Sequence, residues 1–376
     1  MKRHSYYSKN QENIKKGISN IIPFSSLPKL SKVVPGLIKE KIYAITGATG
    51  SAKTKFTKFL AVMNTYNYAK ANLNTGLDVK VIYFALEESP EEFHDSLVCT
   101  LMNVKYGITI SAMELNGYLG TLSKDVLSKI VSIENDLADL YSYLEIHNIS
   151  NPTGMYKLCR EISRNRGEHY FTEIEKPGEI ELTYDEYNKL DSDNKSRFKY
   201  SHYKPNNPRE HVIVITDHLN LLATEKGADT LSKSMTKWCT TYCKKQITKH
   251  WKWTCVHVHQ QFMSADSKQY TSSGTSIADK LYPSLDGLGD NKIVARDYYV
   301  VFGLFNPYRY QLDSELEYDI TELKNKYRTL LILKNRLGNE GDRLGLLFNG
   351  ASDRFKEMPN NTDTRELRKL YLAINK

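Results

Sequence analysis

Short apolar runs alternate with longer amphipathic stretches along most of the chain, starting near Lys41. The runs predict strands at residues 42–45, 79–86, 212–215, 255–258, 299–304 and 330–333. The run at 212–215 reads Val-Ile-Val-Ile, and a strand that is apolar throughout is typical of a parallel sheet covered on both faces. Strands separated by helical stretches indicate βαβ units. We therefore predict an α/β fold with a mainly parallel central sheet flanked by helices.

Two segments depart from this alternation. Residues 1–30 form a polar, basic lead-in that is a candidate for docking between subunits, and residues 31–376 form one large domain. Residues from about 165 to 210 are charged and rich in Tyr, and we interpret them as a surface insertion between core elements. Ser89 to Glu92 and Thr183 to Glu186 each have an N-cap hydroxyl and a Glu three positions later. This pattern satisfies free backbone N–H groups and predicts the start of a helix at both places.

Composition limits the class of protein. The 376 residues include 52 Lys and Arg against 44 Asp and Glu, a net charge of +8, and 40% are hydrophobic, which excludes a chain disordered throughout. No apolar run approaches the roughly 18–20 residues of a membrane-spanning helix, and the first residues lack the apolar segment of a secretory signal. The five cysteines are few and scattered, so we expect a reducing, cytoplasmic location without membrane contact. The basic excess permits a phosphate-backbone partner, although an evenly solvated surface would have the same charge.

The sharpest chemical signal is a Gly-rich run between a predicted strand and a predicted helix. A phosphate-binding loop needs inward-pointing backbone N–H groups, a Lys for the β- and γ-phosphates and a hydroxyl for Mg²⁺. The run supplies these groups from Gly47, Thr49, Gly50, Ser51, Ala52, Lys53 and Thr54. It therefore predicts ATP and Mg²⁺ as cofactors, against the alternative of a chance Gly-rich turn. Ala52 occupies the position of the pattern's second Gly, and its Cβ would crowd the loop if φ is positive there.

Carboxylates follow two of the predicted strands. Glu87 comes directly after the strand at 79–86, at the edge of an open α/β sheet where ligands bind, and such a Glu can polarise a water that attacks a γ-phosphate. The alternative is an acid at the start of the next helix, which suits Glu88 better than Glu87. Asp217 follows the strand at 212–215 and resembles a Walker-B acid that holds Mg²⁺.

A Gln and a group of possible metal ligands lie near the strand at 255–258. Gln260 follows that strand and is placed to sense a γ-phosphate. Zinc is the competing interpretation, because several potential ligands are close in sequence: Cys239, Cys243, His250, Cys255, His257 and His259. Structural zinc sites commonly use tight pairs such as Cys-x₂-Cys, whereas Cys239 and Cys243 have the spacing of one helix face.

Two cations follow the last predicted strand of the sheet. Lys334 and Arg336 come just before a Gly-Asn-Glu-Gly turn, after which the chain returns through residues 344–348. They are either solvated residues of a hairpin, or they project into the nucleotide of a neighbouring subunit as an arginine finger does.

The chain order of phosphate loop, strand-end Glu, strand-end Asp, strand-end Gln and Lys-x-Arg resembles the ATPase domain of DnaB-like replicative helicases. The resemblance covers roughly residues 30 to 356 and is carried by Phe84–Glu87, Ile215–Leu221, Gln260, Lys334–Arg336 and Phe348–Phe355. It implies a RecA-like P-loop ATPase core. The sequence differs from the family pattern at Ala52, His218 and His259. Since only about 30 residues precede the core, we expect a phage or mobile-element version without the family's N-terminal domain.

The resemblance also implies roles for individual residues. Lys53 would bind the phosphates, Thr54 and Asp217 would hold Mg²⁺, Glu87 would align water, Gln260 would sense the γ-phosphate, and Lys334 and Arg336 would act from the next subunit. Central-channel loops for single-stranded DNA would lie between residues 262 and 297. Lys268 and Lys292 would contact phosphates there and Tyr270 would stack on bases, unless this stretch is only a surface loop.

These observations predict an ATP-dependent DNA helicase motor that translocates on single-stranded DNA as a hexameric ring during replication, with a primase or a loader as further partner. Two alternatives remain from the sequence. One is a RecA/KaiC-like DNA-binding ATPase that assembles on DNA for recombination or loading without unwinding it. The other is a non-hydrolysing structural ring, because Ala52 departs from the phosphate-loop pattern.

Overall fold

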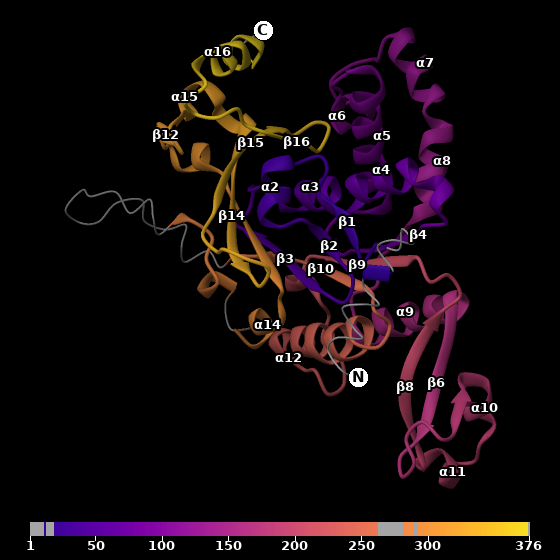
Figure 1. Ribbon diagram of the computed structural model, residues 1–376. Coiled ribbons are helices and arrows are strands. Elements are labelled where there is room, and N and C mark those ends of the chain that lie inside the picture. Colours follow the sequence, from indigo (N-terminus) through magenta and orange to yellow (C-terminus); the bar gives the residue numbers. More distant parts are fainter. Residues whose placement is uncertain (1–10, 13–18, 262–280, 289–291, 375–376) are drawn as a thin grey trace.

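The computed structural model describes residues 11–12, 19–261, 281–288 and 292–374 (Figure 1). Within these residues the centre of the fold is a nine-stranded sheet in the order β16-β15-β14-β11-β3-β10-β9-β4-β5. Its strands are β3 (Ile42–Gly47), β4 (Asp78–Ala85), β5 (Leu144–His147), β9 (Glu210–Asp217), β10 (Thr254–Gln260), β11 (Val300–Phe305), β14 (Tyr327–Asn335), β15 (Arg343–Asn349) and β16 (Arg354–Glu357). All six strands expected from the apolar runs are present, each with slightly different ends.

The sheet is parallel over most of its width. Strands β11, β3, β10, β9, β4 and β5 pair in parallel, and β14, β15 and β16 add an antiparallel edge. The predicted α/β class with a mainly parallel sheet is therefore confirmed.

Helices cover both faces of the sheet, because alternate residues of each central strand point to opposite sides. Tyr43 and Ile45 of β3 pack with the helices of one face, whereas Ile42 and Ala44 pack with those of the other. The first face carries α3 (Lys53–Thr57), the π-helical segment η1 (Lys58–Met63), α4 (Asn64–Ala71), α5 (Pro90–Tyr106) and α8 (Glu134–Tyr143). The second carries α9 (Pro152–Arg166), α12 (Leu231–Thr236), the π-helical segment η4 (Lys237–Thr248) and α14 (Lys292–Asp297).

Shorter elements connect these layers. They are α2 (Pro28–Val33), α6 (Ala112–Leu115), α7 (Lys124–Ser132), α15 (Ile320–Leu323), α16 (Thr364–Ile374), η2 (Leu73–Thr75), η3 (Leu219–Leu221), η6 (Asp286–Leu288), η7 (Pro307–Tyr310), η8 (Lys324–Lys326), β12 (Ser314–Glu315) and β13 (Tyr318–Asp319). The capping box expected at Ser89 is formed with Glu92 at the start of α5, and the one at Thr183 is formed with Glu186. Across the described residues, no helix combines the length and apolar character needed to cross a bilayer.

The described part of the N-terminal segment belongs to the core. Strand β1 (Ile21–Pro23) pairs antiparallel with β2 (Gly36–Ile38), and the side chains of Ile22, Phe24 and Leu27 are fully buried. The boundary expected at residue 30 therefore falls inside continuous packing. The sequence analysis described this segment as polar because it has few apolar residues, but Ile22, Phe24 and Leu27 pack into the core.

The stretch interpreted as an insertion forms a second, three-stranded sheet in the order β7-β6-β8. Its elements are β6 (Gly167–Glu173), β7 (Glu181–Thr183), α10 (Tyr184–Lys189), α11 (Ser192–Ser196) and β8 (Phe198–Pro205). It extends away from the central sheet at the amino ends of β9 and β4, the side away from α3 (Figure 1).

Candidate nucleotide-binding site

Four neighbouring strands deliver the predicted site residues to one edge of the sheet. The phosphate loop follows β3, Gln260 ends β10, Asp217 ends β9 and Glu87 follows β4, and these strands are adjacent in the order β3-β10-β9-β4. The carboxyl ends of parallel strands form the crevice where open α/β sheets bind ligands. The topology therefore brings together residues that are up to 213 positions apart in the sequence, from Gly47 to Gln260.

The loop itself has the backbone of a phosphate cradle with one strained residue. A Cβ atom on Gly47 would lie only 2.5 Å from the carbonyl oxygen of Leu304, so the loop's first position requires glycine. Ala52 has φ 74° and ψ 34°, in the left-handed region that L-residues other than Gly rarely adopt. The positive φ that the sequence analysis identified as unfavourable for Ala52 is therefore present, and the loop adopts it although Ala52 has a Cβ atom.

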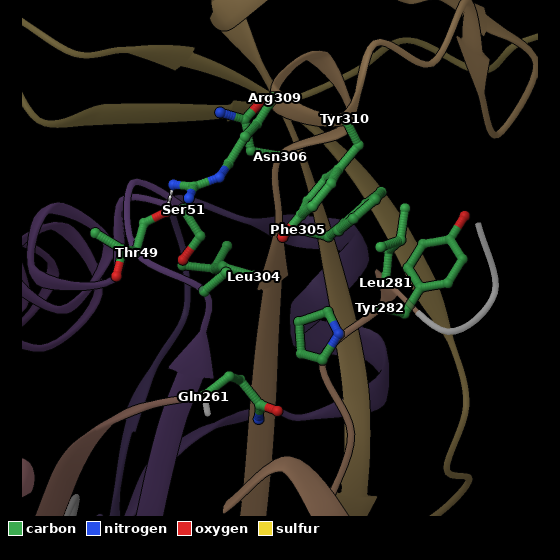
Figure 2. Close-up of a pocket in the computed structure, with 12 residues that line it drawn as sticks. Thr49, Ser51, Gln261, Leu281, Tyr282, Leu304, Phe305, Asn306, Arg309 and Tyr310 are labelled. Carbon is green, nitrogen blue, oxygen red and sulfur yellow. Dashed lines mark hydrogen bonds between the residues drawn. The ribbon is translucent and has the colours of Figure 1, made fainter. Parts of the chain in front are cut away.

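Two arginines that the sequence analysis did not identify donate hydrogen bonds to carbonyl oxygens of this loop. The buried guanidinium of Arg328 on β14 donates from Nε to the carbonyl oxygen of Ser51 (3.1 Å) and from Nη2 to that of Gly50 (3.4 Å). Arg309 on η7 donates from Nη1 to the carbonyl oxygen of Thr49, so its side chain reaches over the loop (Figure 2). Burial lowers the pKa of Arg328 to about 10, which leaves it charged at neutral pH.

Arg309 also borders a small pocket beside the loop. Figure 2 shows the rings of Phe305, Tyr310 and Tyr282 beside this pocket, with Thr49 and Ser51 on the loop side. Aromatic faces next to a phosphate cradle offer a stacking surface for a planar base.

Lys53 begins α3 and is largely buried at the centre of the site. Its Nζ donates to the carbonyl oxygen of Ala48 at 3.0 Å. Burial lowers the pKa of Lys53, and the nearby carboxylates of Asp217 and Glu87 oppose this effect. The predicted phosphate-binding cation and the two predicted acids are therefore close enough to interact.

Asp217 and Thr54 offer oxygen atoms of the kind that Mg²⁺ binds. The Asp217 carboxyl group is buried, and Tyr83 donates from its hydroxyl to Oδ2 at 2.6 Å. Its other oxygen, Oδ1, is buried without a hydrogen-bond partner among the described residues. Burial raises the pKa of Asp217 to about 6, although the Tyr83 and Thr54 hydroxyls lower it. A desolvated carboxylate oxygen with a nearby hydroxyl is a donor set that Mg²⁺ accepts.

The two consecutive glutamates after β4 have different surroundings. Glu88 forms an ion pair with the buried Nζ of Lys58 at 2.5 Å. The Glu87 side chain is 58% exposed and lies 3.4 Å from Nε2 of His218. Burial lowers the pKa of His218, although the neighbouring Glu87 opposes this effect, so this His is neutral at neutral pH. Glu88 is thus committed to packing, and Glu87 faces the crevice.

Gln260 contacts the phosphate loop directly. Its Nε2 donates to Oγ1 of Thr49 at 2.7 Å, and its backbone N–H donates to Oδ1 of Asn220 at 3.1 Å. The second bond ties the end of β10 to the segment after Asp217, so Gln260 links the loop to the neighbouring strand.

Lys334 and Arg336 lie apart from this cluster. Pairing of β14 with β11 and of β11 with β3 places Lys334 level with Ala44, about 10 Å along the strands from the start of the loop. Lys334 donates to the carbonyl oxygen of Ala295 (2.7 Å) and Arg336 to that of Arg296 (2.6 Å), at the carboxyl end of α14. Lys334 therefore lies level with the middle of β3 and Arg336 near its amino end, both away from their own phosphate loop.

The proposed zinc ligands are only partly gathered. Cys243, Cys255 and His257 bring their ligand atoms within 4.8 Å of one another in the core, the single such group among the described residues. His259 instead hydrogen-bonds the hydroxyl of Tyr298. A structural zinc site takes four ligands, so these three are one short, and their burial suits a packed core.

The predicted DNA contacts lie mostly beyond what can be described. Lys268 and Tyr270 fall outside the described residues, and Lys292 is the first residue of α14. Their roles stay predictions.

No protein-family model and no curated protein matches the chain. Among solved structures, a DnaB-like replicative helicase, whose structure is described together with its interactions with primase, is similar over 94% of this chain and 67% of that chain. The TM-score is 0.63 and the sequence identity is 16%. At this identity the likeness concerns the fold. The central sheet and its flanking helices thus have the architecture found in a DnaB-like helicase.

Proposed function

We propose that the protein is an ATP-driven motor of the DnaB-like type that moves along single-stranded DNA as a ring, with six subunits expected. The observation that carries the proposal is the convergence of Lys53, Asp217, Glu87 and Gln260 at the carboxyl edge of four adjacent parallel strands. The similarity of the whole fold to a DnaB-like replicative helicase supports it.

Each side chain has a distinct part in hydrolysis. Lys53 leaves the carbonyl oxygen of Ala48 to bind the phosphates, and the N–H groups of the loop bind their oxygens. Thr54 and Asp217 hold Mg²⁺, which when bound neutralises charge on the β- and γ-phosphates. Glu87 orients the attacking water, since its carboxylate is exposed to the crevice. Gln260 contacts the loop through Thr49 and reports the state of the γ-phosphate to β10.

Lys334 and Arg336 complete the site of a neighbouring subunit in this proposal. They lie away from their own phosphate loop, so a site shared with the next subunit gives both cations a part in hydrolysis. A head-to-tail interface of this kind closes into a ring when the rotation between neighbouring subunits divides a full turn evenly. The replicative neighbour's contact with primase makes a primase a candidate partner here as well.

The test is ATP hydrolysis with and without single-stranded DNA, together with electron-microscope images of the particles. We expect magnesium-dependent hydrolysis that DNA stimulates, closed rings, and unwinding of a forked duplex. Lys53→Ala should abolish nucleotide binding, and Lys55→Ala is the matched control, because Lys55 is paired with Asp353 at 2.5 Å. Filaments without unwinding would favour a RecA-like role, and rings that bind but never hydrolyse ATP would favour a structural one.

A further inference from the structure

A second cavity lies where the insertion meets the core. It has a volume of about 300 Å³ and is lined by side chains of α9, of the three-stranded sheet with α10, and of η4. Its residues belong to the amino-end side of β9, whereas the phosphate loop lies beyond the carboxyl ends of the strands. The cavity is therefore separate from the candidate nucleotide-binding site, and its volume is at the lower end of small-molecule pockets.

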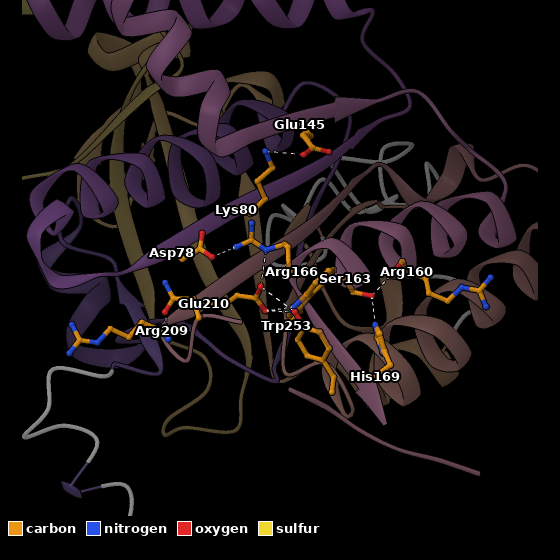
Figure 3. Close-up of polar contacts among 12 residues, drawn as sticks. Asp78, Lys80, Glu145, Arg160, Ser163, Arg166, His169, Arg209, Glu210 and Trp253 are labelled. Atoms are coloured by element: carbon orange, nitrogen blue, oxygen red, sulfur yellow. Dashed lines mark hydrogen bonds and ion pairs between the residues drawn. The ribbon is translucent and has the colours of Figure 1, made fainter. Parts of the chain in front are cut away.

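Two arginines of α9 give this cavity an uncompensated positive charge. Arg160 and Arg164 are one helical turn apart, so they share a face of α9, where like charges repel. Among the described residues no carboxylate forms an ion pair with either. Arg166 on the same helix is different, because it pairs with Asp78 (2.6 Å) and Glu210 (2.8 Å). Figure 3 shows Arg166 between those two acids, while the guanidinium of Arg160 points away from them.

The guanidinium of Arg164 has unused donors inside the protein. Its Nε and Nη2 atoms are buried and have no hydrogen-bond partner among the described residues, and its Cζ atom lies 3.7 Å from the centre of the Tyr184 ring. A buried unpaired donor is costly, and a guanidinium fork matches the oxygens of a phosphate. An anion with two acceptor oxygens would match these two donors.

Aromatic rings form the rest of the wall. Tyr156 stacks on Tyr242 with ring centres 4.4 Å apart, and Trp251 lies parallel to Tyr156 at 5.6 Å. Such faces stack on nucleic-acid bases with little dependence on sequence. His169 adds no charge, because burial lowers its pKa to about 4. Planar rings beside two cations thus suit a ligand with a flat apolar part and a phosphate.

We propose that this cavity binds one nucleotide unit, with the base against the aromatic wall and the phosphate between Arg160 and Arg164. The nucleotide belongs either to single-stranded DNA or to a free mononucleotide, since both present this chemistry. The proposal does not depend on hydrolysis at the phosphate loop.

Cross-linking tests the DNA source. The full-length protein is irradiated with an oligodeoxynucleotide that carries 5-iododeoxyuridine, and the cross-linked peptides are identified by mass spectrometry. We expect cross-links to Tyr156, Tyr184 or Tyr242. The Arg160→Gln/Arg164→Gln double variant should lose them, and its DNA affinity should fall by about tenfold with a salt dependence reduced by roughly 0.7–1.4 in slope. Lys157→Gln removes an exposed cation of the same helix outside the cavity and should change neither.

Calorimetric titration with thymidine monophosphate tests the free-nucleotide source. Binding to the wild type that the double variant loses, without cross-links from the oligonucleotide, assigns the cavity to mononucleotides. Because the donors of Arg164 are unpaired, Arg164→Gln should lower the melting temperature only slightly, through its lost contact with Tyr184, and ATP hydrolysis without DNA should be unchanged. A large loss of melting temperature would show a structural role, and absence of both cross-links and titration heat would overturn the proposal.

Discussion

The side-chain amide of Gln260 donates to the hydroxyl of Thr49 at 2.7 Å, which joins the end of β10 to the phosphate loop. Gln260→Ala removes this link while leaving Lys53 and the backbone of the loop in place. We therefore expect ATP affinity to be retained and stimulation of hydrolysis by single-stranded DNA to be lost. Thr49→Val removes the same bond from the other side. In a double-mutant cycle the double variant should be no worse than either single variant, and additive losses would show that the two residues act separately.

Glu87 and Glu88 should respond differently to the same substitution. Glu87→Gln keeps the shape of the side chain but not the carboxylate that orients water, so hydrolysis should fall by about 10²–10⁴-fold while ATP still binds. Glu88→Gln weakens the ion pair with the buried Lys58 and should lower the free energy of unfolding by about 1–3 kcal/mol. Nucleotide-binding titrations, steady-state hydrolysis and urea unfolding separate these effects. Normal turnover in Glu87→Gln would assign the water-orienting role to another residue.

Ala52→Gly should stabilise the loop, because glycine adopts a φ of 74° without strain. Relief of the left-handed backbone, less the added freedom of glycine in the unfolded chain, predicts a gain of up to about 1 kcal/mol. Hydrolysis should be equal or faster. Ala48→Gly is the matched control. Ala48 lies in the same loop without a positive φ, so this substitution should only lower the stability of the protein. Slower hydrolysis in Ala52→Gly would mean that the loop depends on the methyl group.

Asp217→Asn should make the protein more stable at neutral pH. The pKa of Asp217 is about 6 in the folded protein, against 3.8 for an ordinary Asp, so its stabilising effect is complete below about pH 4 and is lost as the pH rises through 6. The free energy of unfolding of the variant should therefore be larger than that of the wild type by on the order of 3 kcal/mol at pH 7.5, and the difference should shrink toward pH 4. Urea unfolding at both pH values without nucleotide measures this.

Asp353→Asn is the contrasting control for that experiment. Asp353 is also buried, but its carboxylate accepts from Lys55 and from Ser96, each at 2.5 Å. Removing this paired charge should lower stability at pH 7.5, since Lys55 loses its carboxylate partner and Lys58, which keeps Glu88, loses a second carboxylate at 4.0 Å. Equal changes in the free energy of unfolding for Asp217→Asn and Asp353→Asn would contradict the interpretation of Asp217 as a desolvated acid without a compensating positive charge.

Local patterns explain which parts of the fold were predictable. The run at 212–215 and the capping boxes at Ser89 and Thr183 are determined by neighbouring residues, so the sequence was sufficient for them. The strands β6 and β8 were missed, because half-exposed strands of a small sheet are charged and Tyr-rich rather than apolar.

The supports of the phosphate loop depended on contacts that sequence patterns do not reveal. Arg328 is 277 positions from Ser51, and its only signal is a cation shortly before the apolar run at 330–333. Arg309 likewise reaches Thr49 from 260 positions away. The different environments of Glu87 and Glu88 also required the position of Lys58 on η1. The sequence was enough to identify candidate site residues, whereas the residues that contact them depend on how the strands and helices are arranged in the fold.

Arg336 offers the most discriminating test of a shared site. It is exposed, and its side chain donates to the carbonyl oxygen of Arg296 at the end of α14, while its backbone N–H donates to Tyr299 whatever the side chain is. Arg336→Ala should therefore leave folding nearly unchanged. If its guanidinium completes a neighbour's site, ATP should still bind but hydrolysis should fall by on the order of 10³–10⁵-fold. Lys124→Ala, at an exposed cation of α7, is the control and should hydrolyse ATP normally.

Mixing variants then decides whether the defect lies between subunits. Arg336→Ala subunits keep an intact Lys53, and Lys53→Ala subunits keep an intact Arg336. An interface is therefore active when the phosphate loop of an Arg336→Ala subunit faces Arg336 of a Lys53→Ala subunit. At equal mixing about a quarter of the interfaces of a head-to-tail ring are of this active kind. Hydrolysis should therefore reappear in proportion to mixed assembly, whereas two defects within one subunit's own site could not rescue each other. Mixtures that stay inactive despite proven co-assembly, or a silent Arg336→Ala, would leave Lys334 and Arg336 as caps of α14 and remove the shared-site mechanism.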